Sequence, residues 1–140
     1  METPVRRRGR PRLLDRDALA PALGAEVADV DARIEEAAQA GRWTLIDVYA
    51  DWCVACQPIE HRVLKSAQVQ QALAPYFLIK LDLSHYDVTH QALLNQWEIL
   101  GPPTYLFLND QQQEIRGLRL TGAFTEAELL EQIERFVQAQ

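Results

Sequence analysis

The stretch IDVYADWCVACQPIE, residues 46–60, decides the fold of this chain, because it holds both cysteines of the sequence. Cys53 and Cys56 are three residues apart, where an apolar, strand-like run gives way to a helical pattern. Such a pair can be a structural crosslink, a metal clip or a redox pair. The rest of the sequence discriminates between these uses.

Two apolar runs indicate buried strands. WTLIDVY (residues 43–49) is nearly continuous, as expected of a central strand that is covered on both faces. YFLIKLDL (residues 76–83) predicts a second buried strand, after a helical segment that ends near Pro75. EVAD (residues 26–29) is a candidate for a short first strand.

Helix signals separate these runs. Asp29 or Asp31 can cap a helix that ends before Gly41, and Asp87 can cap another. A capping box that starts at Thr125 opens the last helix.

The segments 104–109 and 114–120 flank a polar turn and predict a hairpin. The element order is then β-α-β-α-β-α-β-β-α, which predicts an α/β fold whose sheet is covered by helices on both faces.

Length and composition indicate one globular domain: 140 residues, 48% hydrophobic and 24% charged. The first 16 residues hold six arginines against two acidic residues, so the formal net charge of −6 comes from the rest of the chain. We expect residues 1–24 to be a flexible basic tail or linker and residues 25–140 to form the domain. The tail contains RGRP, the core of a DNA-binding AT-hook, but one copy is weak, and we expect no nucleic-acid binding.

No run approaches the about 18 apolar residues that a membrane span needs. The basic N-terminus has no apolar segment behind it, so we expect no intact signal peptide or transmembrane segment in this chain.

The spacing of the cysteines favours redox chemistry. A crosslink across so short a loop adds little stability, because the entropy removed depends on loop length. A zinc site needs four ligands, and the three histidines form no ligand motif with the cysteines, so we expect no bound metal. A C-x-x-C pair at a strand-to-helix junction of an α/β pattern indicates a thioredoxin-like redox site.

At the start of a helix, the free N–H groups and the helix dipole stabilise a thiolate. We therefore expect Cys53 to be the nucleophile and Cys56 to resolve the mixed disulfide. No cofactor is required, since the electrons reside in the cysteines.

Four segments carry a resemblance: YADWCVAC, VQQALA, LGPPT and TGAFTEAELLEQI. They are similar to the thioredoxin superfamily and, within it, to the family of C-terminal thioredoxin-like domains of the thiol:disulfide interchange protein DsbD. The similarity covers roughly residues 26–138. It implies a thioredoxin fold, with a central mixed five-stranded β-sheet flanked by helices on both faces.

For function, the resemblance implies a disulfide reductase at the periplasmic face of a bacterial inner membrane. It would accept electrons from a transmembrane domain and pass them to an N-terminal domain, which supplies disulfide isomerases and cytochrome c biogenesis. We expect a monomer that is part of, or next to, a membrane protein. The alternatives are a free-standing thioredoxin-like reductase, a soft-metal (copper) carrier that uses the same C-x-x-C, and a binding module with an incidental disulfide.

Two acidic residues near the cysteines are candidates for catalysis. Asp47 lies within an apolar strand, where a carboxyl is costly unless it is neutral or hydrogen-bonded. By resemblance it is the buried acid that exchanges a proton with Cys56, and Glu60 is the second acidic residue near the site. Two carboxylates oppose thiolate formation, so we expect a reductant rather than an oxidant.

Three further residues are expected to bind substrate. Trp52 precedes the first cysteine and is expected to cover the edge of the site. Pro103 matches the cis-proline that faces the cysteines in this superfamily. The residue before it, Pro102, has a carbonyl but no N–H, so a partner strand loses one backbone hydrogen bond there.

Overall fold

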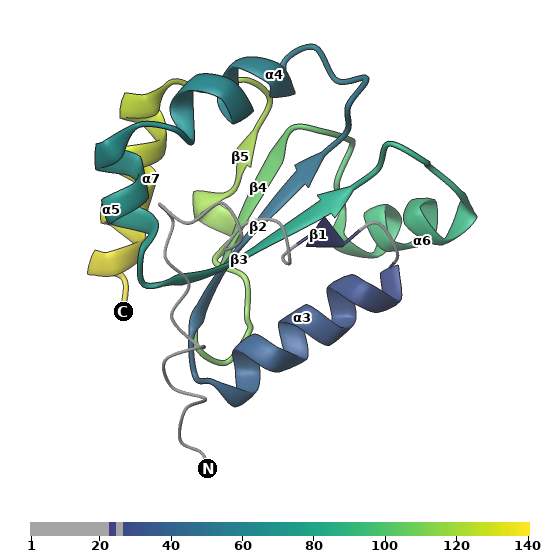
Figure 1. Ribbon diagram of the computed structural model, residues 1–140. Coiled ribbons are helices and arrows are strands. Elements are labelled where there is room, and N and C mark those ends of the chain that lie inside the picture. Colours follow the sequence, from purple (N-terminus) through teal and green to yellow (C-terminus); the bar gives the residue numbers. More distant parts are fainter. Residues whose placement is uncertain (1–22, 25–26) are drawn as a thin grey trace.

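Five strands form one mixed sheet in the computed structural model, which describes residues 23–24 and 27–140 (Figure 1). The strands are β1 (Leu23–Gly24), β2 (Trp43–Tyr49), β3 (Tyr76–Asp82), β4 (Thr104–Leu108) and β5 (Leu120–Thr121). Their order across the sheet is β1-β3-β2-β4-β5, with β1, β3 and β2 parallel and β4 antiparallel to both of its neighbours. The expected thioredoxin fold with a five-stranded mixed sheet is confirmed.

Helices cover both faces of the sheet (Figure 1). They are α3 (Val27–Gln39), α4 (Cys56–Pro58), the π-helical η2 (Ile59–Val63), α5 (Ala67–Leu73), α6 (Val88–Trp97), the 3₁₀ turn η3 (Arg116–Leu118) and α7 (Glu126–Gln138). Two separate hydrophobic clusters result, one under α3 and α6 and the other under η2, α5 and α7. The central strand β2 contributes to both clusters, which explains its nearly continuous apolar sequence.

Helix ends follow the sequence signals. The Asp87 carboxylate accepts hydrogen bonds from the N–H groups of Thr89 and His90, at 2.9 and 3.0 Å, and so caps α6. The capping box at the start of α7 is formed, with the Thr125 hydroxyl accepting from the Glu128 N–H at 3.1 Å. These caps pair N–H groups that a helix leaves free at its N-terminus.

The first strand differs from the expectation. EVAD does not form it, because residues from Val27 onward are helical and present Val27, Val30 and Ile34 to the sheet at helical spacing. The strand is Leu23–Gly24, which pairs in parallel with β3. The sheet therefore begins two residues before the expected boundary at residue 25. The rest of the expected tail, residues 1–22, lies outside the described residues.

The prediction that residues 114–120 form the second strand of the hairpin was also wrong. After β4, a single bridge joins Leu108 to Glu114, and the chain then turns through η3 before the two-residue strand β5. An ion pair of 2.6 Å between Glu114 and Arg119 spans this turn, and Arg119 also donates to the carbonyl oxygens of Trp97 and Glu98. These contacts hold the segment against the end of α6 in place of a regular strand.

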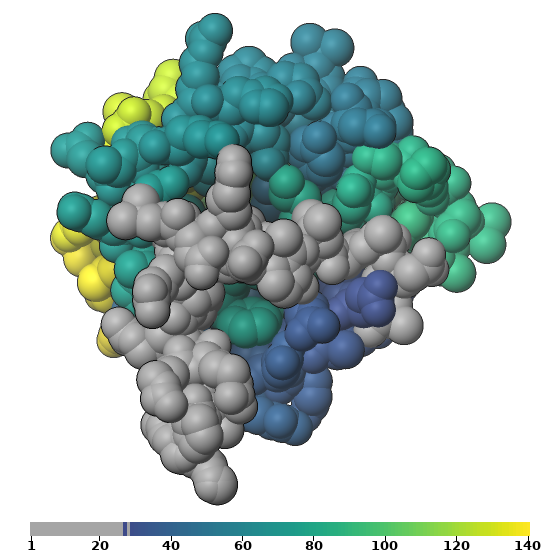
Figure 2. Space-filling view, viewed as in Figure 1, coloured from purple at the N-terminus to yellow at the C-terminus, as the bar shows by residue number. Residues whose placement is uncertain are grey.

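The segment that leads from β3 into α6 projects from the body of the domain (Figures 1 and 2). Tyr86 and Val88 are exposed there. Among the described residues, no helix has both the length and the apolar character needed to cross a membrane.

Candidate active site

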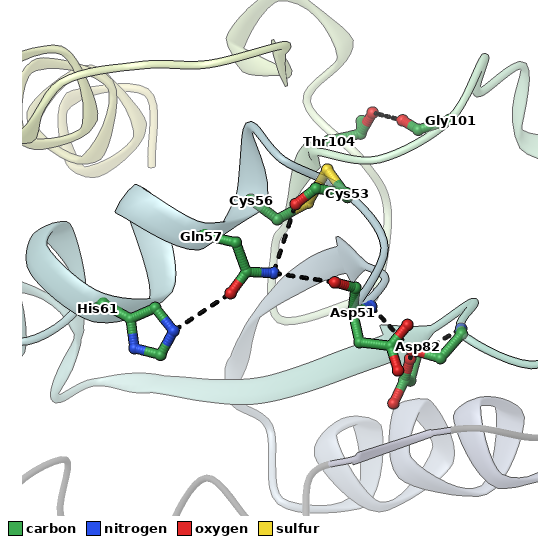
Figure 3. Close-up of a disulfide and its surroundings, with 9 residues drawn as sticks. Asp51, Cys53, Cys56, Gln57, His61, Asp82, Gly101 and Thr104 are labelled. Carbon is green, nitrogen blue, oxygen red and sulfur yellow. Dashed lines mark hydrogen bonds between the residues drawn. A yellow bond between two sulfur atoms is a disulfide. The ribbon is translucent and has the colours of Figure 1, made fainter.

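Cys53 and Cys56 form a disulfide at the carboxyl end of β2 (Figure 3). Their Cα atoms are 5.3 Å apart, and both side chains are largely buried, Cys53 at 7% and Cys56 at 2% relative exposure. The helix begins at Cys56 rather than at Cys53: the Cys56 N–H donates to the Cys53 carbonyl oxygen at 3.2 Å. Cys53 thus precedes the first helical turn and is the more accessible sulfur-bearing residue.

Gln57 anchors the turn that carries Cys53. Its side-chain amide donates to the carbonyl oxygens of Asp51, at 3.2 Å, and of Cys53, at 3.4 Å (Figure 3). Its carbonyl oxygen faces a ring nitrogen of His61 at 3.2 Å. From the other side, the Asp51 N–H donates to the Ser84 hydroxyl at 2.9 Å. The backbone around Cys53 is therefore held from the helix and from the loop after β3.

Pro58 changes the helix that follows. Pro58 has no N–H to donate to the Val54 carbonyl oxygen, which accepts from the Gln57 N–H at 3.2 Å. The next residues form the π-helix η2, closed by a hydrogen bond from the Leu64 N–H to the Ile59 carbonyl oxygen at 2.9 Å. η2 carries Glu60 over the sheet.

Asp47 lies in the middle of β2, with Lys80 opposite it on β3 and Tyr105 opposite it on β4. Burial raises the pKa of the Asp47 carboxyl well above its ordinary value, and the neighbouring Glu60 carboxyl adds to this rise. The Lys80 ammonium and the Tyr105 hydroxyl act in the opposite direction. Asp47 is thus a buried acid that holds its proton to a higher pH than a surface aspartate does.

Lys80 organises the charges around this acid. Its Nζ lies 2.6 Å from the Glu60 carboxylate and 4.3 Å from the centre of the Tyr49 ring. Burial disfavours the charge on Lys80, but the hydrogen bond and charge of Glu60, together with Asp47, outweigh it and raise the pKa of Lys80. Glu60 is therefore a member of an ion pair rather than an isolated negative charge near the cysteines.

A pocket of about 40 Å³ lies between η2, α5 and the sheet. Its polar lining is formed by Asp47, Glu60, Gln70, Lys80 and Tyr105, and apolar side chains that include Leu64 line the rest. No group of three or more histidine, cysteine, aspartate or glutamate side chains suited to a metal ion occurs within residues 23–24 and 27–140.

Exposed apolar side chains lie close in sequence to the disulfide and to the loop that faces it. Trp52 is 57% and Val54 is 85% exposed, and Leu100, just before the GPPT segment, is 98% exposed. Exposed apolar side chains next to the cysteines in sequence are of the kind that a partner protein covers.

The GPPT segment contains the expected cis peptide bond, between Pro102 and Pro103. The segment is held by the Thr104 hydroxyl, which donates to the Gly101 carbonyl oxygen at 2.6 Å beside the disulfide (Figure 3). The Pro103 carbonyl oxygen accepts from the Gly122 N–H at 2.9 Å. Pro103 is buried and Pro102 is partly exposed.

The sequence reasoning missed Lys80, Tyr105 and Gln57. Lys80 had a usable signal, because a lysine inside the apolar run YFLIKLDL is as unusual as an aspartate in WTLIDVY. Tyr105 had none, because a tyrosine in a buried strand is typical of a core. Gln57 had none either, because an amide on a short helix is typical of a surface.

Residues 25–110 match the family model described as thioredoxin-like. The chain is 37% identical over 113 residues to the thiol:disulfide interchange protein DsbD 1 of Pseudomonas aeruginosa. The matched region is 81% of this chain and 19% of that protein. DsbD of Yersinia pestis is 38% identical over 94 residues, covering 67% of this chain and 16% of that protein.

Among solved structures, the oxidised C-terminal domain of DsbD from Neisseria meningitidis superimposes with a TM-score of 0.71 and 24% identity, covering 81% of this chain and 98% of that domain. A thioredoxin from Thermus thermophilus gives a TM-score of 0.66 at 22% identity, covering 77% of this chain and 83% of that protein. The present chain spans less than a fifth of the length of the full-length relatives named above.

Proposed function

Because this chain belongs to the thioredoxin-like family, we propose that it is a thiol:disulfide oxidoreductase that reduces disulfides of other proteins. The observation that carries this proposal is the Cys53–Cys56 disulfide, which follows the central strand and precedes a helix. Its relatives named as thiol:disulfide interchange proteins support the same reaction class.

The reaction is a dithiol–disulfide exchange. The Cys53 thiolate attacks a disulfide of the partner, forms a mixed disulfide and releases one partner sulfur as a thiolate. The Cys56 thiol then loses its proton, and its sulfur attacks Cys53. The intramolecular disulfide forms, and the second partner sulfur leaves and takes up a proton, so two electrons have moved from this chain to the partner.

Asp47 accepts the proton of Cys56 in the resolving step. Its burial within β2, the strand that leads to the cysteines, and the raised pKa of its carboxyl support this role. Glu60 tunes the acid, because it raises the pKa of Asp47 while it is itself held by Lys80.

A reducing potential is the expected property. Val54 and Ala55 place no charge between the cysteines, and Lys80, the cation in the neighbouring pocket, is paired with Glu60. A thiolate that receives little stabilisation makes the reduced form less stable, which is the reverse of what makes an oxidant such as DsbA.

The potential is measured by equilibrating the cysteine pair against glutathione and then dithiothreitol buffers. We expect a value well below the glutathione couple, near the roughly −270 mV of thioredoxin. A value near or above that of glutathione would identify an oxidant or an isomerase and contradict the proposal.

For partners and location, we propose the arrangement of a DsbD-like protein at the periplasmic face of a bacterial inner membrane. The chain would take electrons from a transmembrane domain and pass them to an N-terminal domain. The 37% identity to DsbD 1 of Pseudomonas aeruginosa over 81% of this chain, which is 19% of that protein, supports a role as one domain of such a relay.

Pro102→Leu is expected to tighten partner binding. The substitution restores a backbone N–H to the segment before Pro103, and an extended partner strand gains one hydrogen bond of about 0.5–1.5 kcal/mol, equivalent to roughly a 2- to 12-fold lower Kd. The measurement is the Kd of the Cys56→Ser, Pro102→Leu double variant for a peptide from a substrate disulfide, against Cys56→Ser alone. An unchanged Kd would show that Pro102 does not limit docking.

A further inference from the structure

Tyr105 carries a buried hydroxyl that the proposed reaction has not used. Its side chain is 1% exposed, and its hydroxyl oxygen has no hydrogen-bond partner within the described part of the chain. Buried polar atoms are nearly always paired, and leaving one unpaired costs free energy. The groups around this hydroxyl must therefore explain why a tyrosine rather than a phenylalanine lies here.

The group opposite this hydroxyl is the buried acid. Tyr105 on β4 and Asp47 on β2 are cross-strand partners, and both line the pocket of about 40 Å³ under η2. The Tyr105 ring packs edge-on against Phe124, with centroids 4.9 Å apart. The two side chains act on each other across this pocket without meeting the distance and angle of a formed hydrogen bond. Catalytic hydrogen bonds often tighten only during reaction.

The electrostatics agree with this geometry. The hydroxyl lowers the pKa of Asp47, which means that it favours the ionised carboxylate. Burial raises the pKa of Tyr105, and the charges of Asp47 and Glu60 raise it further, so the phenol keeps its proton and acts as a donor.

We propose that Tyr105 is a positioning residue whose hydroxyl donates a hydrogen bond to the Asp47 carboxylate and so sets the pH range in which Asp47 accepts the proton of Cys56. This inference rests on the proposed role of Asp47. Tyr105 itself gives up no proton, because its hydroxyl only stabilises the charge that Asp47 carries before it takes the proton from the thiol.

Two other ionisable groups act on Asp47 directly, and a third acts on one of those two. Glu60 on η2 raises the pKa of Asp47, Lys80 on β3 lowers it, and Tyr49 on β2 acts on Lys80. The other side chains that contact or face Tyr105 from β5 and the loop after it are the apolar Leu120 and Phe124. Removing the hydroxyl leaves these charges in place, so the pKa of Asp47 must rise.

The test is Tyr105→Phe, which keeps the ring and removes the hydroxyl. We expect the pKa of Asp47, measured by carbon-13 NMR titration of the oxidised protein, to rise by roughly one unit, the size of a hydrogen bond to a charged group. The pH–rate profile of insulin reduction should move to higher pH by the same amount. At a pH below both pKa values the rate should fall about tenfold, and at high pH it should equal the unsubstituted rate.

Tyr76→Phe is the matched control. The Tyr76 hydroxyl is also buried and without a partner among the described residues, but Tyr76 pairs with Trp43 at the opposite end of β2. Its removal should leave the pH profile and the titration of Asp47 unchanged.

An unchanged Asp47 titration in Tyr105→Phe would overturn the inference, and so would a rate loss that is equal at every pH, which indicates a structural effect. Adding Tyr105→Phe to Asp47→Asn should shift the profile no further. If Asp47→Asn itself leaves the pH profile unchanged, the proposed role of Asp47 fails, and the NMR titration still decides whether Tyr105 acts on that carboxyl.

Discussion

Cys53→Ser is expected to abolish disulfide reduction, with a loss of at least about a thousandfold, or roughly 4 kcal/mol in the barrier. A serine hydroxyl at this position is not ionised near neutral pH and cannot attack a disulfide as a thiolate does. Cys56→Ser is expected to abolish turnover to the same extent by another route. Cys53 still attacks, but nothing resolves the mixed disulfide, so the complex accumulates.

The two variants are compared by insulin reduction and by non-reducing electrophoresis after incubation with a disulfide-containing protein. Cys56→Ser should give a covalent complex that dithiothreitol separates by reducing the mixed disulfide, and Cys53→Ser should give none. The opposite pattern would exchange the roles of the two cysteines. Cys53→Ser with full biological activity would indicate a binding module, whereas tight Cu(I) binding by the reduced protein without insulin reduction would indicate a copper carrier.

Asp47→Asn is expected to stabilise the oxidised protein at neutral and alkaline pH and to lower its rate of disulfide reduction. The pKa of Asp47 is raised in the folded protein, so folding favours its protonated form. The stability that this form contributes is fully present below the ordinary pKa of 3.8. It is lost as the pH rises toward the folded-state pKa, by about 1.4 kcal/mol per pH unit, and the loss is constant above that value. Asparagine is neutral at every pH and avoids this loss.

The free energy of unfolding by urea, measured at pH 4, 6 and 8, checks this prediction. The difference between Asp47→Asn and the unsubstituted protein should be smallest at pH 4 and grow with pH. Asp110→Asn, at an exposed turn after β4, is the control and should differ by less than about 0.5 kcal/mol throughout. A constant difference at all pH values would mean that Asp47 is not the buried acid described here.

The same variant should reduce insulin more slowly by roughly a hundredfold, the lower end of general acid–base contributions. Higher stability combined with lower activity separates the catalytic role of Asp47 from general damage to the fold, which would lower both. A variant with unchanged activity would remove Asp47 from the proton transfer while leaving the cysteine chemistry intact.

Much of the fold is local and could be read from the sequence. The run WTLIDVY predicted a strand buried on both faces, which is confirmed, and Asp87 and Thr125 cap the helices that they were expected to cap. The first strand and the second arm of the hairpin were missed, since Leu23–Gly24 and Leu120–Thr121 have only two residues each. Strands this short exist because a neighbouring strand pairs with them, and no periodicity reveals that.

The sequence by itself determined the redox pair, because the C-x-x-C spacing confines both sulfurs to one turn, and it identified Asp47 as a carboxyl that an apolar strand does not tolerate without cause. The chemistry of that carboxyl was decided by the tertiary structure. Glu60, Lys80 and Tyr105 come from three different elements and meet Asp47 only when β3, β4 and η2 pack around β2. The pKa of a buried acid depends on such neighbours and on burial, and both exist only in the folded chain.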